Sequence, residues 1–164
     1  MSDLKFNFTP RARQIISVVK KLANKANIKP NEYHLFIQIL ENVTPSLESA
    51  IEELQLDLFD LKVFFYAVFE EVSSDFEWNG KQEAFKPQLL EDGLKGGYKI
   101  ANKLNHEYIG PEHILLHILS REGSWASKCF LDLGIDEKEL EYVIKSKFDF
   151  TLYEDDSESD VSTS

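Results

Sequence analysis

Two stretches of the chain carry the same pattern: HLFIQILENVTPSLESAIEELQLD at residues 34–57 and HILLHILSREGSWASKCFLDLGID at residues 113–136. In both, apolar residues recur at the three- and four-residue spacing of an amphipathic helix. Each stretch ends in Asp, a residue that favours the N-cap of a following helix. The two align without a gap at an offset of 79 residues. We therefore predict a tandem duplication of one helical unit.

The repeat extends beyond these stretches. Phe8-Thr9-Pro10 pairs with residues 85–87 (FKP) at an offset of 77, and the ANK triplet at residues 23–25 recurs at 101–103. Helix-start signals are frequent, because Thr precedes Pro at 9–10 and again at 44–45. The sequence thus predicts an all-α fold, a tandem pseudo-twofold repeat of two four-helix units with about eight helices. Three apolar positions of the last predicted helix also repeat: Leu61, Phe65 and Phe69 with Leu140, Ile144 and Phe148.

A polar segment interrupts the helical pattern near the middle of the chain. We predict a first repeat over residues 1–72, an inter-repeat linker over 73–84, a second repeat over 85–150 and a tail over 151–164. The tail holds five carboxylates and no Lys or Arg. Such a composition predicts a disordered acidic tail.

Composition limits the classes of function. The 164 residues carry a net charge of −11, which is unfavourable for binding phosphate backbones, so we expect no nucleic-acid partner. The single Cys excludes a disulfide framework and suits a reducing compartment. No apolar run is long enough to span a bilayer, and the N-terminus lacks a signal-peptide pattern. The sequence predicts a cytoplasmic protein without a membrane partner.

Four segments resemble a known family: residues 8–12 (FTPRA), 105–116 (NHEYIGPEHILL), 121–124 (REGS) and 131–136 (LDLGID). They are similar to the Clp repeat domain, the double four-helix N-terminal domain of Clp-type AAA+ unfoldases. The resemblance covers roughly residues 6–148. The second repeat is close to the family pattern, and its YIGxEH signature is specific, whereas the first repeat is diverged.

The resemblance implies a non-catalytic protein-binding module that uses no cofactor. Unfoldases carry the P-loop string GxxxxGK[ST], and this sequence has none, so we expect no ATPase activity. The expected partner is a protein: a Clp-type ATPase, a protease subunit, an adaptor or a substrate segment. Two alternatives to this interpretation remain open. In the first, the chain is a structural subunit that stabilises assembly of a Clp or type-VI-secretion-like complex; in the second, it is the isolated N-domain of a larger unfoldase.

The resemblance also implies ligand-binding residues, because some members hold phosphoarginine in paired acidic pockets. The motif carboxylate of the second repeat is Glu112. In the first repeat the ungapped alignment places Tyr33 there, with Glu32 one residue earlier, whereas a small shift in the loop would place Glu32 there; both registers stay open. The phosphate-side hydroxyl corresponds to Thr9, and to Lys86 in the second repeat. The alternative is structural: Glu112 is a first-turn carboxylate that interacts favourably with the helix dipole.

Catalytic interpretations have little support. His113 and His117 lie one helical turn apart, with His106 upstream, so they are weak candidates for a metal site and a remote metalloenzyme hypothesis. However, no Glu lies between the two helical His residues to act as a base. Cys129 fits a small core residue better than a reactive thiol. We predict that the protein is not an enzyme.

Two segments are candidates for partner docking. Residues 64–69 (FFYAVF) are apolar almost all round a helix, which predicts burial between the repeats or an exposed patch. Phe76 and Trp78 form an aromatic pair in the predicted linker, and they either dock a partner or cover the groove between the repeats. Three glycines in the first helix of the second repeat permit either a close approach or a bend: Gly93, Gly96 and Gly97.

Overall fold

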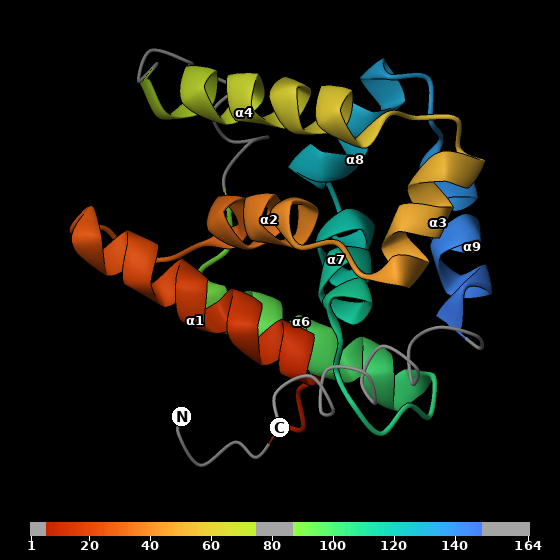
Figure 1. Cartoon of the computed structure of the whole chain (residues 1–164), viewed down its shortest axis with the longest axis horizontal. Helices are drawn as coiled ribbons and strands as arrows, with labels where there is room; N and C mark the ends of the chain where they lie inside the picture. The colour runs from red at the N-terminus through yellow and green to blue at the C-terminus, as the bar shows by residue number, and fades with distance from the viewer. Residues whose placement is uncertain (1–5, 75–86, 149–164) are drawn as a thin grey trace.

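The computed structural model describes residues 6–74 and 87–148, and within these ranges it contains eight α-helices and no strand (Figure 1). The all-α prediction is confirmed. The first four-helix unit precedes residues 75–86, and the second follows them. The helices are α1 (Pro10–Lys25), α2 (Glu32–Glu41), α3 (Pro45–Glu53), α4 (Leu58–Ser74), α6 (Leu90–Lys103), α7 (Pro111–Ser120), α8 (Trp125–Asp132) and α9 (Glu137–Ser146).

Helix starts follow the capping signals of the sequence. Thr9, Thr44, Ser124 and Asp136 each accept a hydrogen bond from a backbone N–H in the first turn of the helix that follows. These bonds satisfy N–H groups that have no partner inside the helix. Side-chain caps therefore fix the beginnings of α1, α3, α8 and α9, and the sequence predicts those of α1, α3 and α9.

The first helices of the two units begin differently. Pro10 is the first residue of α1, but α6 begins at Leu90, three residues after the aligned Pro87. Its N-cap, Leu89, offers no side-chain acceptor. The reason is a backbone contact with the other repeat, since the Leu90 N–H donates to the Pro30 carbonyl at 3.0 Å.

The two helices α2 and α7 lie at the centre of the molecule in Figure 1, with α1 and α6 on one side and α4 and α8 on the other. The α3 and α9 helices pack against each other at the edge. In α7, eight of ten residues are buried, as expected for a helix enclosed by its neighbours. The core is continuous across the two units, which therefore form one packed body.

Each repeat contributes an extended segment to the other. The residue before the α1 cap, Phe8, forms a parallel bridge with Ile109, which precedes α7. Correspondingly, Leu89 before α6 forms an antiparallel bridge with Asn31 before α2. A segment of each repeat therefore pairs with the backbone just before the central helix of the other repeat, an arrangement that we call the reciprocal exchange.

Turns between helices also repeat. Asn27 and Asn105, 78 residues apart, have φ values of 60° and 62°. Gln55 has φ 63° at the position where the second repeat has Gly134, with φ 86°. Left-handed backbone is easily adopted by Gly and tolerated by Asn, so the diverged first repeat retains this turn with a less suitable residue.

The glycines of α6 permit close packing. An added methyl group at Gly96 would overlap the His117 ring, and one at Gly97 would lie 2.9 Å from Ile114 Cγ1. At Gly93 the nearest atom is Leu35 Cδ1 at 3.1 Å. Of the two predicted roles, the structure shows the close approach, with side chains of α7 and α2 resting on the surface of α6.

Candidate functional site

The first turns of α2 and α7 each carry a buried carboxylate. Glu32 is the first residue of α2 and Glu112 the second residue of α7, and the exposed fraction of each is 0%. The third residue is His in both helices. His34 Nδ1 accepts from the Asn31 N–H, and His113 Nδ1 accepts from the N–H of the equivalent N-cap, both at 2.9 Å. The structure thus has the ungapped register in this turn, with Tyr33 at the position that corresponds to Glu112.

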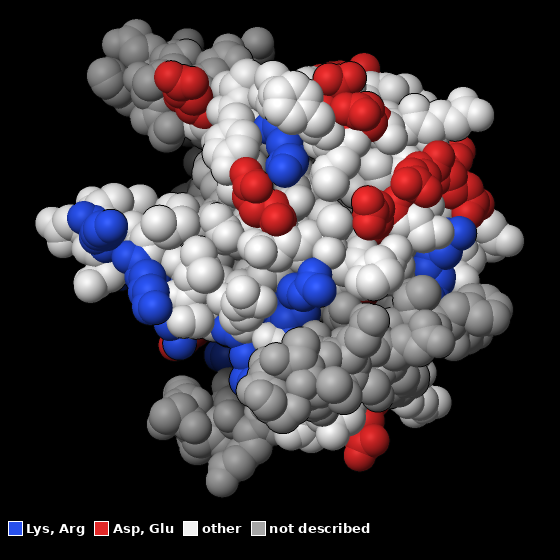
Figure 2. Space-filling view, viewed as in Figure 1, with Lys and Arg blue, Asp and Glu red and all other residues white. Residues whose placement is uncertain are grey.

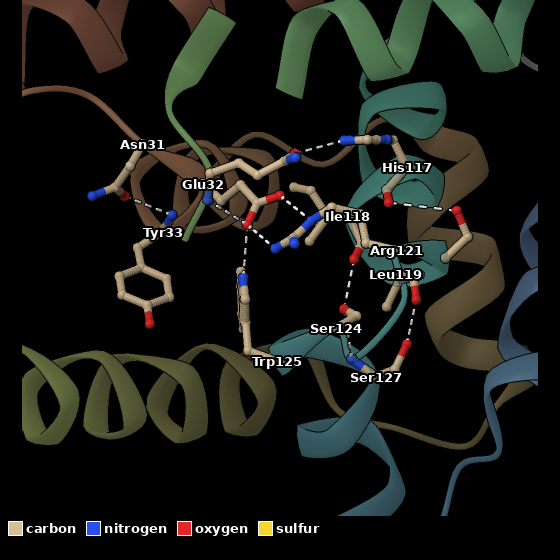
Figure 3. Close-up of polar contacts among 12 residues, drawn as sticks. Asn31, Glu32, Tyr33, His117, Ile118, Leu119, Arg121, Ser124, Trp125 and Ser127 are labelled. Carbon is tan, nitrogen blue, oxygen red and sulfur yellow. Dashed lines mark hydrogen bonds and ion pairs between the residues drawn. The ribbon is translucent and has the colours of Figure 1, made fainter. Parts of the chain in front are cut away.

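Glu32 binds a guanidinium group of its own chain. Arg121, which follows α7, donates from Nη2 to Oε1 at 2.6 Å and from Nε to Oε2 at 2.9 Å. This is the bidentate geometry that makes arginine–carboxylate pairs strong. The Trp125 indole N–H and the Gln88 backbone N–H also donate to Oε1, at 2.9 and 3.0 Å. Figure 3 shows the carboxylate between the Arg121 and Trp125 side chains.

An aromatic cluster encloses this ion pair. Trp125 is 0% exposed, and Tyr33 meets its ring edge-on at a centroid distance of 5.0 Å. The Tyr33 ring stacks on Phe69 of α4 at 4.5 Å. Burial is the main cause that raises the pKa of Tyr33 above its ordinary value, and the neighbouring Glu32 adds to it. Water is thus excluded from one side of the Glu32–Arg121 pair, which strengthens its attraction.

Glu112 receives hydroxyl groups instead. Its Oε2 accepts from Thr44 Oγ1 at 2.5 Å and from Ser46 Oγ, both at the start of α3. Thr44 is also the α3 cap, so the carboxylate fixes that helix end against α7. The other oxygen, Oε1, is buried without a hydrogen-bond partner among the described residues. Glu112 thus has fewer donors than Glu32.

The two carboxylates are used reciprocally. Glu112 of the second repeat contacts the start of α3 in the first, and Glu32 of the first repeat contacts the start of α8 in the second. The contacted residues Ser46 and Trp125 are 79 residues apart, the offset of the repeat. The seam between the repeats therefore consists of two related contacts with different chemistry.

The remaining predicted ligand residues lie in different places. Thr9 is 1% exposed, and its hydroxyl accepts from the Ala12 N–H at 3.1 Å as the α1 cap. Tyr33 lies in the aromatic cluster described above. Lys86, Phe76 and Trp78 fall outside the residues that the structure describes.

The three weak metal candidates do not converge. His113 Nδ1 accepts a hydrogen bond, so its neutral ring carries the proton on Nε2 and donates it to His106 Nδ1 at 2.8 Å. His117 turns away and contacts Gln88 Oε1 at 2.9 Å. Burial, with His106 as a second cause, lowers the pKa of His113 to about 3. Phe148 stacks on the His113 ring, with ring centroids 5.0 Å apart.

Other chemically reactive groups are similarly enclosed. Cys129 is buried, and desolvation raises the pKa of its thiol to about 12, so it is not a thiolate at neutral pH. Across residues 6–74 and 87–148, no cluster of three His, Cys, Asp or Glu side chains has a geometry suited to a metal ion.

A surface cleft of about 310 Å³ lies next to the Glu32–Arg121 pair. Arg121 lines it together with the start of α8, including Ser124 and Lys128, and with Asp136 of the α9 cap. The Arg121 side chain is 22% exposed, whereas the Glu32 side chain behind it is fully buried. Arg121 thus both pairs with the buried carboxylate and contributes to the lining of the cleft.

Residues 84–164 match the family model described as the Clp repeat (R) N-terminal domain. The chain carries a Clp repeat N-terminal domain. It is also 27% identical over 141 residues to a probable ATP-dependent Clp protease ATP-binding subunit of Chlamydia pneumoniae. That alignment covers 81% of this chain and 16% of the relative, so the chain spans about a sixth of the length of that protein.

The Clp repeat domain is a non-catalytic domain, in agreement with the enclosed chemistry of the seam. Among the helices that the structure describes, none is long and apolar enough to cross a membrane. The matched residues include α7, α8 and α9, and hence Glu112 and Arg121 of the seam.

Sequence reasoning missed the partners of the two carboxylates. Arg121 belonged to a motif segment but had no assigned role, and Thr44 was assigned only as a cap. Ser46 and Trp125 were not singled out. A usable signal was the repeat itself, because all four partners lie within three residues of the N-cap of the third helix of a unit, Thr44 or Ser124.

Proposed function

We propose that this chain is a non-catalytic protein-binding module that acts with a Clp-type ATPase as an adaptor or accessory protein. The match to the Clp repeat domain supports the association with the Clp system. The proposal that the module is non-catalytic rests on the contacts of Glu32 and Glu112 between the repeats. Both carboxylates are 0% exposed and accept hydrogen bonds from side chains of the same chain. Groups held in this way stabilise a rigid body and are not free to act on a substrate.

The experiment is affinity purification of the tagged full chain from its own cells, with mass spectrometry of the bound proteins. Tag alone and an unrelated acidic helical protein with the same tag serve as controls. We expect enrichment of a Clp-type ATPase or protease subunit over both controls. Recovery of one unrelated protein without any Clp component would contradict the proposal, although it would leave the fold unchanged.

A narrower proposal concerns a basic ligand. Glu32 already accepts a guanidinium in bidentate geometry, and the residue that supplies it, Arg121, is part of the lining of a surface cleft. We propose that an arginine side chain of a ligand binds Glu32 only when it replaces Arg121. A ligand role for Glu112, Thr9, Tyr33 and Lys86 stays a prediction.

Chemical rescue tests this exchange. The Arg121→Ala variant should gain thermal stability when methylguanidinium is added at millimolar concentration, because the cation re-pairs the buried carboxylate. The same addition should leave the wild type unchanged, as should methylammonium with the variant at equal ionic strength. An equal response of the wild type and the variant would contradict the proposal.

A further inference from the structure

The outward face of α4 is apolar. Phe59, Val63 and Tyr66 have exposed fractions of 69%, 51% and 47%. Their spacing of four and then three residues places them in one line along the helix. The opposite face is also apolar, with Leu61 and Phe65 at 3% and 0% exposed within the core. The segment for which sequence allowed either burial or exposure thus has one face of each kind.

The surroundings of this line are acidic. Residues 32–74 contain nine Asp and Glu side chains and one Lys. That residue, Lys62, is paired with Glu41 at 3.3 Å, and Glu41 also accepts from the Tyr66 hydroxyl at 2.7 Å. Figure 2 shows acidic side chains over α3 and along α4 with a basic group among them, and further Lys and Arg side chains along α1 and at the edge near α3 and α9.

Local chemistry places charge directly beside the apolar line. Asp60 is exposed and neighbours Phe59 in the first turn of α4. Glu41 lies on the other flank, held by Tyr66 and Lys62. The line from Phe59 to Tyr66 spans two helical turns, about 10 Å. An exposed apolar line with acidic flanks complements a helix with an apolar stripe and basic flanks.

We propose that the outward face of α4 docks a basic amphipathic helix of a partner protein. The apolar contacts supply affinity through burial of Phe59 and Val63, and the carboxylates select Lys and Arg on the partner. This surface is separate from the carboxylate seam. The inference rests on the proposed function only in taking the partner to be a protein, and its test needs no Clp component.

The probe is an 18-residue helical peptide of Leu and Lys, compared with a Leu and Glu peptide of the same length and pattern. Binding to the full chain is followed by fluorescence anisotropy. We expect binding of the Lys peptide at least about tenfold tighter than that of the Glu peptide, with a decrease at high salt. Equal binding of both peptides, or binding of neither, would overturn the proposal.

Two double variants locate the surface. Phe59→Ser with Val63→Ser should weaken Lys-peptide binding about tenfold, since it removes the apolar line. Leu131→Ser with Tyr142→Ser is the matched control, because these residues of α8 and α9 are 62% and 71% exposed and lie outside α4. The control should change binding less than about twofold. If the control variant binds the Lys peptide as weakly as the α4 variant does, the proposal is overturned.

The charge contribution is tested separately. Asp60→Asn should weaken binding about threefold and reduce its salt dependence, whereas Asp132→Asn on the exposed surface of α8 should do neither. Urea unfolding midpoints of all variants should match the wild type, because every substituted side chain is exposed. Sedimentation velocity tests a second copy as the occupant. A concentration-dependent dimer that the Phe59→Ser, Val63→Ser variant abolishes would assign the face to self-association and overturn the basic-helix proposal.

Discussion

In the first repeat the buried carboxylate at the start of α2 receives a guanidinium, an indole N–H and a backbone N–H, whereas in the second the carboxylate at the start of α7 receives two hydroxyls. Both carboxylates are buried to the same extent, yet Glu112 retains one oxygen without a partner among the described residues. Each unit thus buries a carboxylate in the first turn of its central helix, but the two carboxylates lie one position apart and have different donors.

The comparison shows that each buried carboxylate between the repeats has hydrogen-bond donors, but that the donors need not be of the same residue type. The Glu32 side chain begins one position earlier in its helix than Glu112, and the groups it contacts are correspondingly different. A buried carboxylate needs donors, and a long Arg side chain and two short hydroxyls are alternative sources. The four predictions below test this difference in order of decreasing effect.

Replacing Arg121 should have the largest effect. Arg121→Ala leaves the Glu32 carboxylate buried with only neutral donors, and the free energy of unfolding should fall by about 3 kcal/mol. Urea denaturation followed by circular dichroism measures it. The control is Lys62→Ala, which removes the pair with Glu41 on the surface and should cost less than about 0.5 kcal/mol. Equal losses in both variants would refute a special role for the Glu32 contact.

The second prediction compares how closely α6 packs against the central helix of each repeat, α7 at Gly96 and α2 at Gly93. Gly96→Ala places a methyl group against the His117 ring and should lower the free energy of unfolding by about 2 kcal/mol. Gly93→Ala is the matched control, because Leu35 Cδ1 at 3.1 Å is the end of a flexible side chain. The intrinsic preference of helices for Ala acts equally in both. If Gly93→Ala destabilises as much, close packing on His117 is not the cause.

The third prediction compares the two capping histidines by pH. Burial lowers the pKa of His113 to about 3 and also lowers that of His34. The unfolded chain therefore binds protons at pH values where the folded His113 does not, and stability is complete above about pH 6.5 and decreases as the pH falls towards 3. The slope attributable to His113 is at most about 1.4 kcal/mol per pH unit.

Unfolding measured at several pH values should show this slope flattened more by His113→Gln than by His34→Gln. The reason is that His34 is only half-buried, whereas His113 is 0% exposed. Identical slopes in the wild type and the His113→Gln variant would show that other groups cause the acid sensitivity.

The smallest effect is expected at the hydroxyl side of the seam. Ser46→Ala removes one of the two donors to Glu112, and the free energy of unfolding should decrease by about 1 kcal/mol. Ser146→Ala, which removes only a hydroxyl bond to the Val143 carbonyl within α9, should have almost no effect. If Ser46→Ala is also neutral, Thr44 alone satisfies the carboxylate.

The helices could be predicted from sequence because their signals are local. Thr9 and Thr44 each precede a Pro, and Ser124 and Asp136 precede amphipathic runs. Each cap residue directly precedes its helix and accepts from a backbone N–H two or three residues later, so the signal lies within a few residues of the helix start. The start of α6 carries no such signal, because its N-cap Leu89 has no side-chain acceptor and the Leu90 N–H bonds to the Pro30 carbonyl of the other repeat. Local patterns carry no information about such a contact.

The seam could be predicted only in part. The motif pointed to Glu32 and Glu112 as candidate ligand residues, with a favourable interaction with the helix dipole as the alternative for Glu112. Neither interpretation named partners in the same chain. Their donors lie 89 and 68 residues away, at Arg121 and Thr44. Which side chain reaches a buried acid over such a separation depends on how the helices pack, and helix periodicity does not determine that.

The reciprocal exchange at the N-terminal ends of α2 and α7 has a consequence for cleavage of the backbone. A protease that cuts between residues 75 and 86 would yield two fragments, each holding the donors that the other fragment's carboxylate needs. The fragments should therefore migrate as one particle in native conditions and separate only in denaturant. Produced individually, each should remain incompletely folded until it is mixed with its complement, so that a molecule with two repeats is not a molecule with two independent halves.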